Sequence, residues 1–185
     1  MSGLEIEIKY EVDTHSNLVL SSAKLISAGL EQNSYIDFNK SLSSKGSSLR
    51  VRGYNNEVII TLKEKGVILP SGVKKKPETN IPLNYDFNET LRFFSKIGAA
   101  ETGYYEKKHR AIMDLVFKKE HFAICLDTIV ANKNERYFIE IEGSEESKIL
   151  ELADKIGINN PKLNTRVIKS SYYELFAMPR ANPIF

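Results

Sequence analysis

The sequence predicts a single-domain α+β protein in which an antiparallel sheet or barrel carries added helices. About eight short runs of alternating polar and apolar residues spread over the chain, as in strands with one apolar face. Compact turn sequences such as Asn55-Asn56 separate some of these runs, as hairpins require. At 185 residues, the chain is long enough to bury one sizeable core.

Alternation predicts strands over 4–12, 32–38, 47–54, 57–65, 73–83, 103–116, 119–130 and 136–143. In the fifth of these ranges, Pro77 and Pro82 interrupt the pattern and predict an edge strand or a bulge. The Ser-, Gly- and Lys-rich segment 42–48 is a predicted loop, and so is 67–72 with its Pro70-Ser71-Gly72 turn. The fold is therefore mostly strands joined by short connections.

Four segments carry helical patterns. Residues 15–29 hold spaced apolar residues and end at Gly29, a common helix stop. Residues 86–97 begin with Asp86 or Asn88 as a helix N-cap. The segments 145–157 and 166–177 close the single domain of residues 1–185, whose core spans about 4–177, and a short tail follows over 179–185.

Composition narrows the class of protein. The 42% apolar and 27% charged residues are ordinary for a soluble globular chain. The 26 Lys and Arg nearly balance the 24 Asp and Glu, which argues against nucleic-acid binding through bulk charge. The single cysteine, Cys125, excludes an intramolecular disulfide and a multi-cysteine metal site. Because no leader pattern or long apolar stretch is present, we expect a cytoplasmic protein with no membrane partner.

Charge is sorted by sign along the polar faces of the expected strands. Because side chains alternate along a strand, Glu5, Glu7 and Lys9 share one face of the first strand. Other strands pair Arg50 with Arg52, Thr61 with Lys63, Lys108 with Arg110, and Glu140 with Glu142 in the same way. A solvent-exposed face is the ordinary explanation, since antiparallel sheets often have one wet side. Exposed faces usually mix the two signs, however, so this sorting favours bound ions.

Converging faces of this kind would form a site for a metal and phosphate. Mg²⁺ and Mn²⁺ prefer carboxylate oxygens, and the planar guanidinium of arginine suits phosphate oxygens. Phosphoryl transfer uses both, because metals bridge phosphate oxygens while cations neutralise their charge. The residues therefore predict such a site if the sheet is curled, and a wet sheet face if it is not.

The motifs resemble those of the CYTH superfamily, the triphosphate tunnel metalloenzymes that include class IV adenylate cyclase and thiamine triphosphatase. Glu5-Ile6-Glu7-Ile8-Lys9 is similar to the family's Glu-x-Glu-x-Lys signature. The later motifs match in order: Leu49-Arg50-Val51-Arg52, Thr61-Leu62-Lys63, Lys108-His109-Arg110, Leu126-Asp127, Phe138-Ile139-Glu140-Ile141-Glu142 and Ser171-Tyr172-Tyr173-Glu174-Leu175. The similarity covers about residues 4–177.

The resemblance implies an eight-stranded antiparallel β-barrel with a charged tunnel inside and flanking helices outside. It implies a small-molecule triphosphate substrate bound by Lys9, Arg50, Arg52, Lys63, Lys108 and Arg110. The cofactor, Mg²⁺ or Mn²⁺, would be held by Glu5, Glu7, Glu78, Glu140 and Glu142, and the catalytic residues would be Glu5, Glu7, Lys9 and Asp127. Asn80 departs from the family pattern, which often has a second carboxylate after Glu78, and this weakens the case for a second metal.

The leading hypothesis is a Mg²⁺-dependent hydrolase of inorganic tripolyphosphate or an organic triphosphate, such as thiamine triphosphate or a nucleoside triphosphate. The same clamp would serve a class IV-type adenylate cyclase, which converts ATP to cyclic AMP and pyrophosphate. Cyclisation also needs an adenine pocket, which the sequence does not mark. A second alternative is a non-catalytic module that binds polyphosphate. We expect a monomer or homodimer with no nucleic-acid partner.

Overall fold

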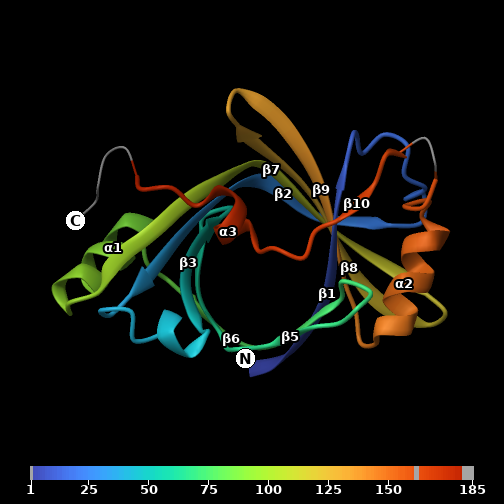
Figure 1. The fold of residues 1–185 in the computed structure, drawn as a ribbon. Helices are drawn as coiled ribbons and strands as arrows, with labels where there is room; N and C mark the ends of the chain where they lie inside the picture. Colours follow the sequence, from blue (N-terminus) through green and yellow to red (C-terminus); the bar gives the residue numbers. More distant parts are fainter. Residues whose placement is uncertain (1, 161–162, 181–185) are drawn as a thin grey trace.

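The architecture is a closed antiparallel barrel with helices outside it (Figure 1). The computed structural model describes residues 2–160 and 163–180. Within these residues the strands are β1 (Ser2–Val12), β2 (Lys24–Asp37), β3 (Ser48–Tyr54), β4 (Glu57–Lys63), β5 (Val67–Ile68), β6 (Lys74–Leu83), β7 (Ala100–Phe117), β8 (Glu120–Ala131), β9 (Asn134–Glu142) and β10 (Arg166–Val167). The helices are α1 (Phe87–Lys96), α2 (Glu146–Lys155), α3 (Tyr172–Phe176) and the 3₁₀ turn η1 (Ser43–Lys45). The expected tail lies outside the described residues from 181 onward.

Eight of the described strands close on themselves. The ladder runs β1-β9-β8-β7-β2-β3-β4-β6, and a further antiparallel pairing of β6 with β1 completes the ring. The two-residue strands β5 and β10 add at β6 and β1. At the β3–β4 hairpin, Asn55 and Asn56 both take positive φ, as a tight two-residue turn requires. The predicted barrel and this hairpin turn are therefore confirmed.

Strand β6 explains how two prolines fit into a closed barrel. It pairs with β1 over Lys74–Thr79 and with β4 over Glu78–Leu83, so the two ladders overlap only briefly. Pro77 lies opposite Leu4 in the first ladder, and Pro82 lies opposite Ile59 in the second. Each proline therefore pairs with only one of the two long neighbouring strands. The backbone N–H that proline lacks is thus missed by one neighbour at most. The prediction of an edge strand or a bulge is wrong, because β6 pairs with a long strand on each side and closes the barrel.

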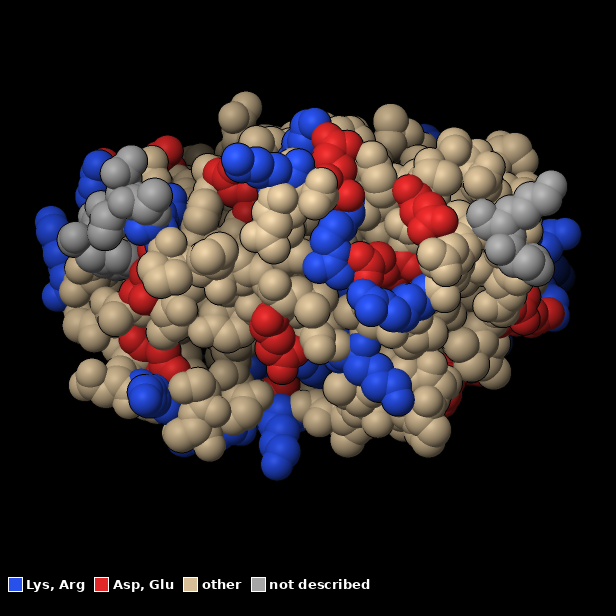
Figure 2. All heavy atoms as spheres, turned by 45° about the horizontal axis from the view of Figure 1, so that its top comes forward, with Lys and Arg blue, Asp and Glu red and all other residues tan. Residues whose placement is uncertain are grey.

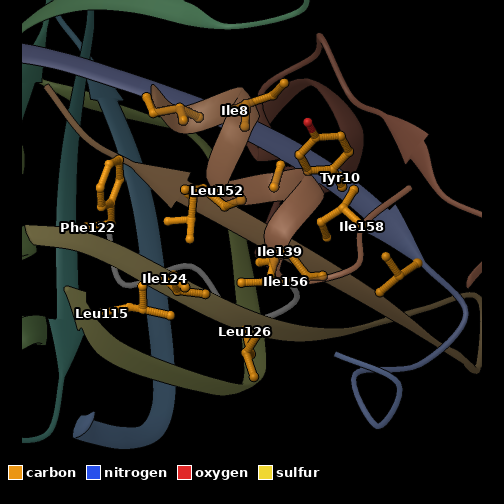
Figure 3. Packing of buried hydrophobic residues seen from close by; sticks show 14 of the residues in the cluster. Ile8, Tyr10, Leu115, Phe122, Ile124, Leu126, Ile139, Leu152, Ile156 and Ile158 are labelled. Atoms are coloured by element: carbon orange, nitrogen blue, oxygen red, sulfur yellow. The ribbon is translucent and has the colours of Figure 1, made fainter. Parts of the chain in front are cut away.

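The largest hydrophobic cluster lies outside the barrel, between α2 and the outer faces of β1, β8 and β9 (Figure 3). Ile8, Ile124, Ile139 and Leu152 are fully buried there. In β1, Ile8 alternates with the inward-facing Glu7 and Lys9, so burial of the outer face fixes the register of the polar one. A second outer cluster forms where α1 packs on β2, β3 and β4. The apolar faces therefore point outward and the polar faces line the interior, as expected.

The helix predictions were partly right. Helices α1 and α2 form where the patterns predicted them, and Asp86 caps α1 by accepting from the backbone N–H groups of Asn88 and Glu89. The helix predicted over 15–29 is wrong, because from Lys24 onward the chain pairs with β7 as strand β2. Gly29 is not a helix stop. It is a close-approach point in β2, since an added Cβ would lie 2.2 Å from Asn55 Oδ1.

The last predicted helix is also shorter than its pattern. The segment 166–177 begins with strand β10, which pairs with β1, so only Tyr172–Phe176 forms a helix. Ser171 caps this helix by accepting from the Glu174 backbone N–H, and the Glu174 carboxylate accepts from the Ser171 backbone N–H in return. This capping box fixes where α3 begins.

Candidate functional site

The inward faces of the barrel strands enclose one charged cavity of about 470 Å³. Every long barrel strand except β8 contributes at least one charged side chain to its lining. The charged lining residues are Glu5, Glu7, Lys9, Asp37, Arg50, Arg52, Lys63, Lys74, Lys76, Glu78, Lys107, Arg110, Glu140 and Glu142 from the strands, and Glu174 from α3. On the outer face drawn in Figure 2, by contrast, basic and acidic side chains are interspersed. Inside the cavity, β3, β4 and β7 contribute basic residues and β9 contributes acidic ones, whereas β1 and β6 contribute both signs.

Three carboxylates converge at one end of the cavity. Oxygens of Glu5, Glu7 and Glu142 lie within 4.8 Å of one another, because the β1–β9 ladder sets Glu7 directly opposite Glu142. Burial, then repulsion from Glu7 and Glu140, raises the pKa of Glu142 to about 7. Burial raises the pKa of Glu5 to about 8, although the nearby Lys63 opposes this rise. Like charges are therefore held together without full compensation, and this all-oxygen donor set fits a hard divalent cation.

The other two predicted metal ligands are engaged by lysines. Lys63 Nζ lies 2.7 Å from an oxygen of Glu5 and 2.7 Å from one of Glu78, so it bridges the two carboxylates. Lys9 Nζ lies 3.0 Å from Glu140. Although burial opposes it, these ammonium groups lower the pKa of Glu78 and of Glu140 to about 2 each. The structure thus brings all five predicted ligands to one cavity. Glu5, Glu7 and Glu142 form an all-carboxylate group, while Glu140 lies in a second close group with Glu142 and Cys125.

Asn80 shares this end of the cavity. Its side-chain oxygen accepts a 2.7 Å hydrogen bond from the Thr61 hydroxyl, and its amide nitrogen donates to Glu78 over 2.6 Å. The amide therefore holds Glu78 in place, a contact that a second carboxylate could not make. A separate surface hollow lined by Glu5, Glu78, Asn80 and Glu142 adjoins the cavity here. This end of the cavity is therefore open to solvent.

The arginines on β3 have few close carboxylate partners. Arg50 is buried, yet among the described residues no carboxylate oxygen lies within 4.0 Å of its guanidinium. Its Nε has no hydrogen-bond partner there. Arg52 has only a distant partner, at 3.9 Å from Glu31, and burial followed by repulsion from Arg50 lowers its pKa. Two neighbouring arginines in this state have the chemistry to hold an anion.

Deeper in the barrel, Lys107 and Arg110 belong to a buried ion-pair network. Lys107 Nζ lies 2.9 Å from Asp127 and 3.1 Å from Glu31, and Arg110 lies 3.3 Å from Glu140. Burial raises the pKa of Asp127 to about 7, against the opposing effect of Arg110. Asp127 is fully buried and contacts these cations, so the structure shows it as a partner of the basic residues.

The structure does not bring Lys108 into the cavity. The β2–β7 register shifts between Glu31, opposite Lys107, and Gly29, opposite Arg110, so β7 carries one extra residue there. This β-bulge breaks strict alternation and points both Lys107 and Arg110 inward. The Lys108 side chain is 60% exposed and pairs with Glu135 on the outer surface. Its expected placement is wrong, and Lys107 lies where Lys108 was expected.

Several residues of the barrel interior escaped sequence reasoning. Glu31 was hidden because its strand begins earlier than predicted, and Lys107 was hidden by the bulge. Lys74 and Lys76 alternate on the inner face of β6, and the Lys74-Lys75-Lys76 run could have indicated them. Tyr105 also lines the cavity, and its hydroxyl has no partner among the described residues.

Comparisons with known proteins place this geometry in a family. Solved structures with the same fold include HpAC1 from Hippeastrum, described as a candidate adenylyl cyclase with a dominant triphosphatase activity (20% identity, 93% of this chain and 94% of that chain, TM-score 0.70). PH1819 from Pyrococcus horikoshii OT3 is similar at 21% identity (92% and 97%, TM-score 0.67). A candidate adenylate cyclase from Vibrio parahaemolyticus is similar at 16% identity (95% and 98%, TM-score 0.62).

A search of curated proteins found no match. Among the described residues, no helix has the length and apolar character needed to cross a membrane. The family model of the CYTH domain matches residues 3–167, which include all of the barrel strands except the first residue of β1, and both Glu-x-Glu pairs. The chain therefore belongs to the CYTH domain family.

Proposed function

We propose that this protein is a Mg²⁺-dependent triphosphatase that acts on inorganic tripolyphosphate or an organic triphosphate. One observation carries the proposal: unneutralised Arg50 and mutually repelling Glu5, Glu7 and Glu142 line the same cavity. A metal–triphosphate complex would compensate both charges at once, because its metal meets the carboxylates and its phosphate oxygens meet the arginines. The dominant triphosphatase activity ascribed to HpAC1 supports the same choice.

In this mechanism, Arg50 and Arg52 bind phosphate oxygens in forked contacts, and Lys9 and Lys107 add point charges from deeper in the barrel. Glu5, Glu7 and Glu142 would hold the divalent cation, which supplies charge neutralisation and orients water when bound. Lys63 contacts Glu5 and Glu78 in the free protein. With Glu5 engaged in holding the cation, the Lys63 ammonium would be able to donate to a phosphate oxygen.

A class IV-type adenylate cyclase is the second candidate function. It is favoured by the candidate cyclases among the structures that share this fold. The cavity lining also includes Ser48 and Thr102, polar residues that an organic head group would contact. A non-catalytic polyphosphate-binding module uses the same basic residues. With one cysteine in the sequence, the chain is suited to the reducing cytoplasm, where we place it.

One incubation separates the three functions. Purified protein is mixed with Mg²⁺ or Mn²⁺ and, separately, tripolyphosphate, ATP and thiamine triphosphate, and orthophosphate, pyrophosphate and cyclic AMP are measured. The proposal expects orthophosphate with pyrophosphate or the organic diphosphate, and no cyclic AMP. Cyclic AMP from ATP would support the cyclase, and tight tripolyphosphate binding without product would support the binding module.

Matched variants test the site. Glu7→Gln should abolish metal-dependent turnover, because it removes one of three clustered carboxylates and keeps the shape of the side chain. Glu135→Gln is the control, since this carboxylate pairs with Lys108 outside the barrel. Full Mg²⁺-dependent activity in Glu7→Gln would contradict the assignment of the metal site.

A further inference from the structure

The chain that follows the barrel returns to the lysines of the cavity. The Ile168 backbone N–H donates to the Lys9 carbonyl over 2.8 Å, and Lys74 Nζ donates to the Ser170 carbonyl over 3.2 Å. Helix α3 then starts at Tyr172 and crosses one end of the barrel opening (Figure 1). The C-terminal segment therefore contacts the phosphate-binding side of the barrel, although its own sequence carries few charges.

The ring of Tyr172 lies directly beneath two buried ammonium groups. Lys9 Nζ is 3.5 Å from the ring centroid and Lys107 Nζ is 4.6 Å from it, both within the range of cation–π attraction. The ring is fixed from two sides. Its hydroxyl donates to Asp127 over 2.9 Å, and its edge meets the ring of Phe138 with centroids 5.2 Å apart. Tyr172 is only 4% exposed, so water does not weaken these contacts.

The two lysines need such a partner because of their burial. The Lys9 side chain is 3% exposed and that of Lys107 is 1% exposed, so each ammonium group needs attraction from the protein. Carboxylates such as Glu140 and Asp127 supply part of it, but each also cancels a positive charge that a phosphate would use. An aromatic face attracts the ammonium groups and carries no formal charge. It therefore keeps Lys9 and Lys107 in place without reducing the net positive charge of the site.

Resting on the function proposed above, we propose that Tyr172 is a positioning residue of the phosphate site, whose ring orients Lys9 and Lys107 toward the bound triphosphate. The hydroxyl has a secondary part, since it fixes the ring through Asp127. The ring face is then the element that the site needs, and a phenylalanine at this position retains it.

The next residue provides a matched control. Tyr173 lies on the same helix, packs its ring on Tyr35 with centroids 4.5 Å apart, and donates to the Thr102 carbonyl over 3.3 Å. Among the described residues, the lysine ammonium groups that lie over aromatic rings are those of Lys9, Lys107 and Lys118, and none of them lies over the ring of Tyr173. Loss of its ring perturbs α3 without touching Lys9 or Lys107.

The test compares tripolyphosphate binding, measured by calorimetry in Mg²⁺ at low temperature, across ring-modified variants. Tyr172→Phe should bind within about twofold of the unmodified protein, because the ring face is kept. Replacing Tyr172 by pentafluorophenylalanine keeps the shape but reverses the charge of the ring face, and should weaken binding about tenfold relative to Tyr172→Phe. Pentafluorophenylalanine at position 173 should leave binding within about twofold.

Where a variant turns over substrate, the loss at position 172 should appear in KM more than in kcat. Equal binding by the Phe and pentafluoro variants at position 172 would overturn the proposal, and so would an equal loss at position 173. Because binding is measured without turnover, a protein that binds but does not hydrolyse refutes the proposed triphosphatase and leaves the role of Tyr172 intact. If the unmodified protein does not bind tripolyphosphate, both proposals fail.

Discussion

Replacing Lys107 and Lys108 separately tests whether the bulge in β7 sets which lysine serves the cavity. Methionine is the substitution, because it keeps most of the length of the side chain and removes its charge. Lys107 Nζ lies 2.9 Å from Asp127 and 3.1 Å from Glu31, and all three side chains are almost fully buried. Lys108 reaches only Glu135, at the outer surface. The two substitutions therefore remove the same charge from opposite sides of one strand.

The expected magnitudes differ widely. Breaking a buried ion pair by removing one partner destabilises a protein by about 3–5 kcal/mol, because the other charge stays buried and unpaired. For a chain of this size, Lys107→Met should therefore lower Tm by roughly 6–20 °C. Loss of one charge-assisted contact to phosphate removes about 1.5–3 kcal/mol, or roughly 10- to 150-fold in tripolyphosphate affinity. Lys108→Met should leave both quantities nearly unchanged, since its ammonium group is solvated.

The assays are thermal unfolding followed by circular dichroism and tripolyphosphate binding in Mg²⁺ by calorimetry below the lowered Tm. Lys107→Arg serves as the matched control that keeps the charge. Equal effects from the two methionine variants, or a larger loss of affinity in Lys108→Met, would refute the reasoning. A larger loss of affinity in Lys108→Met is the result expected if alternation continued unbroken through β7.

Three further expectations follow from the charges of the cavity. Arg50→Met should change the free energy of unfolding by about 1 kcal/mol or less but weaken tripolyphosphate binding at least about tenfold, because Arg50 has no ion-pair partner among the described residues. Arg110→Met is its matched contrast, and urea unfolding should show a loss of about 3–5 kcal/mol, since Asp127 and Glu140 lose their guanidinium. Without metal, the free energy of unfolding should fall as pH rises from about 5 to 8. The folded-state pKa values of Glu142, about 7, and of Glu5, about 8, exceed the ordinary value of 4.5 for a glutamate. The folded state therefore binds more protons than the unfolded state in this range, and raising the pH destabilises it. Urea unfolding at several pH values should show this decrease, and excess Mg²⁺ should reduce it. A metal-free stability that rises with pH over this range would contradict the prediction. Glu142→Gln should stabilise the metal-free protein by about 2–3 kcal/mol at pH 8 while removing Mg²⁺-dependent activity, and a destabilised variant would show that Glu142 is not repelled by its neighbours.

Residues on strictly alternating strands could be placed from the sequence. In β1, Ile6 and Ile8 are buried outside the barrel, so Glu5, Glu7 and Lys9 must face inward. The same logic holds for Glu140 and Glu142 on β9. Wherever the period of two is unbroken, burial of one face determines the other.

Placement failed where local pattern and tertiary pairing disagree. Nothing in the local sequence marks the extra residue between Lys107 and Arg110, because the bulge exists only in relation to β2. The segment before Gly29 has helix-compatible spacing, yet pairing with β7 makes it a strand and brings Glu31 inside. Tyr172 belongs to a motif that the sequence shows. Its contacts with Lys9 of β1 and Lys107 of β7, however, exist only in the closed barrel.

The pairing of β1 with β9 places Glu7 beside Glu142, although these residues lie far apart in the sequence. The carboxylate cluster therefore forms only after β9 has been synthesised and the first strand has found it. An N-terminal fragment that lacks 134–142 retains Glu5 and Glu7 but neither Glu140 nor Glu142, and it cannot close the ring of strands. Long-range pairing of this kind slows folding. Metal binding would thus report completion of the whole barrel, so an incomplete chain would remain inert toward triphosphates.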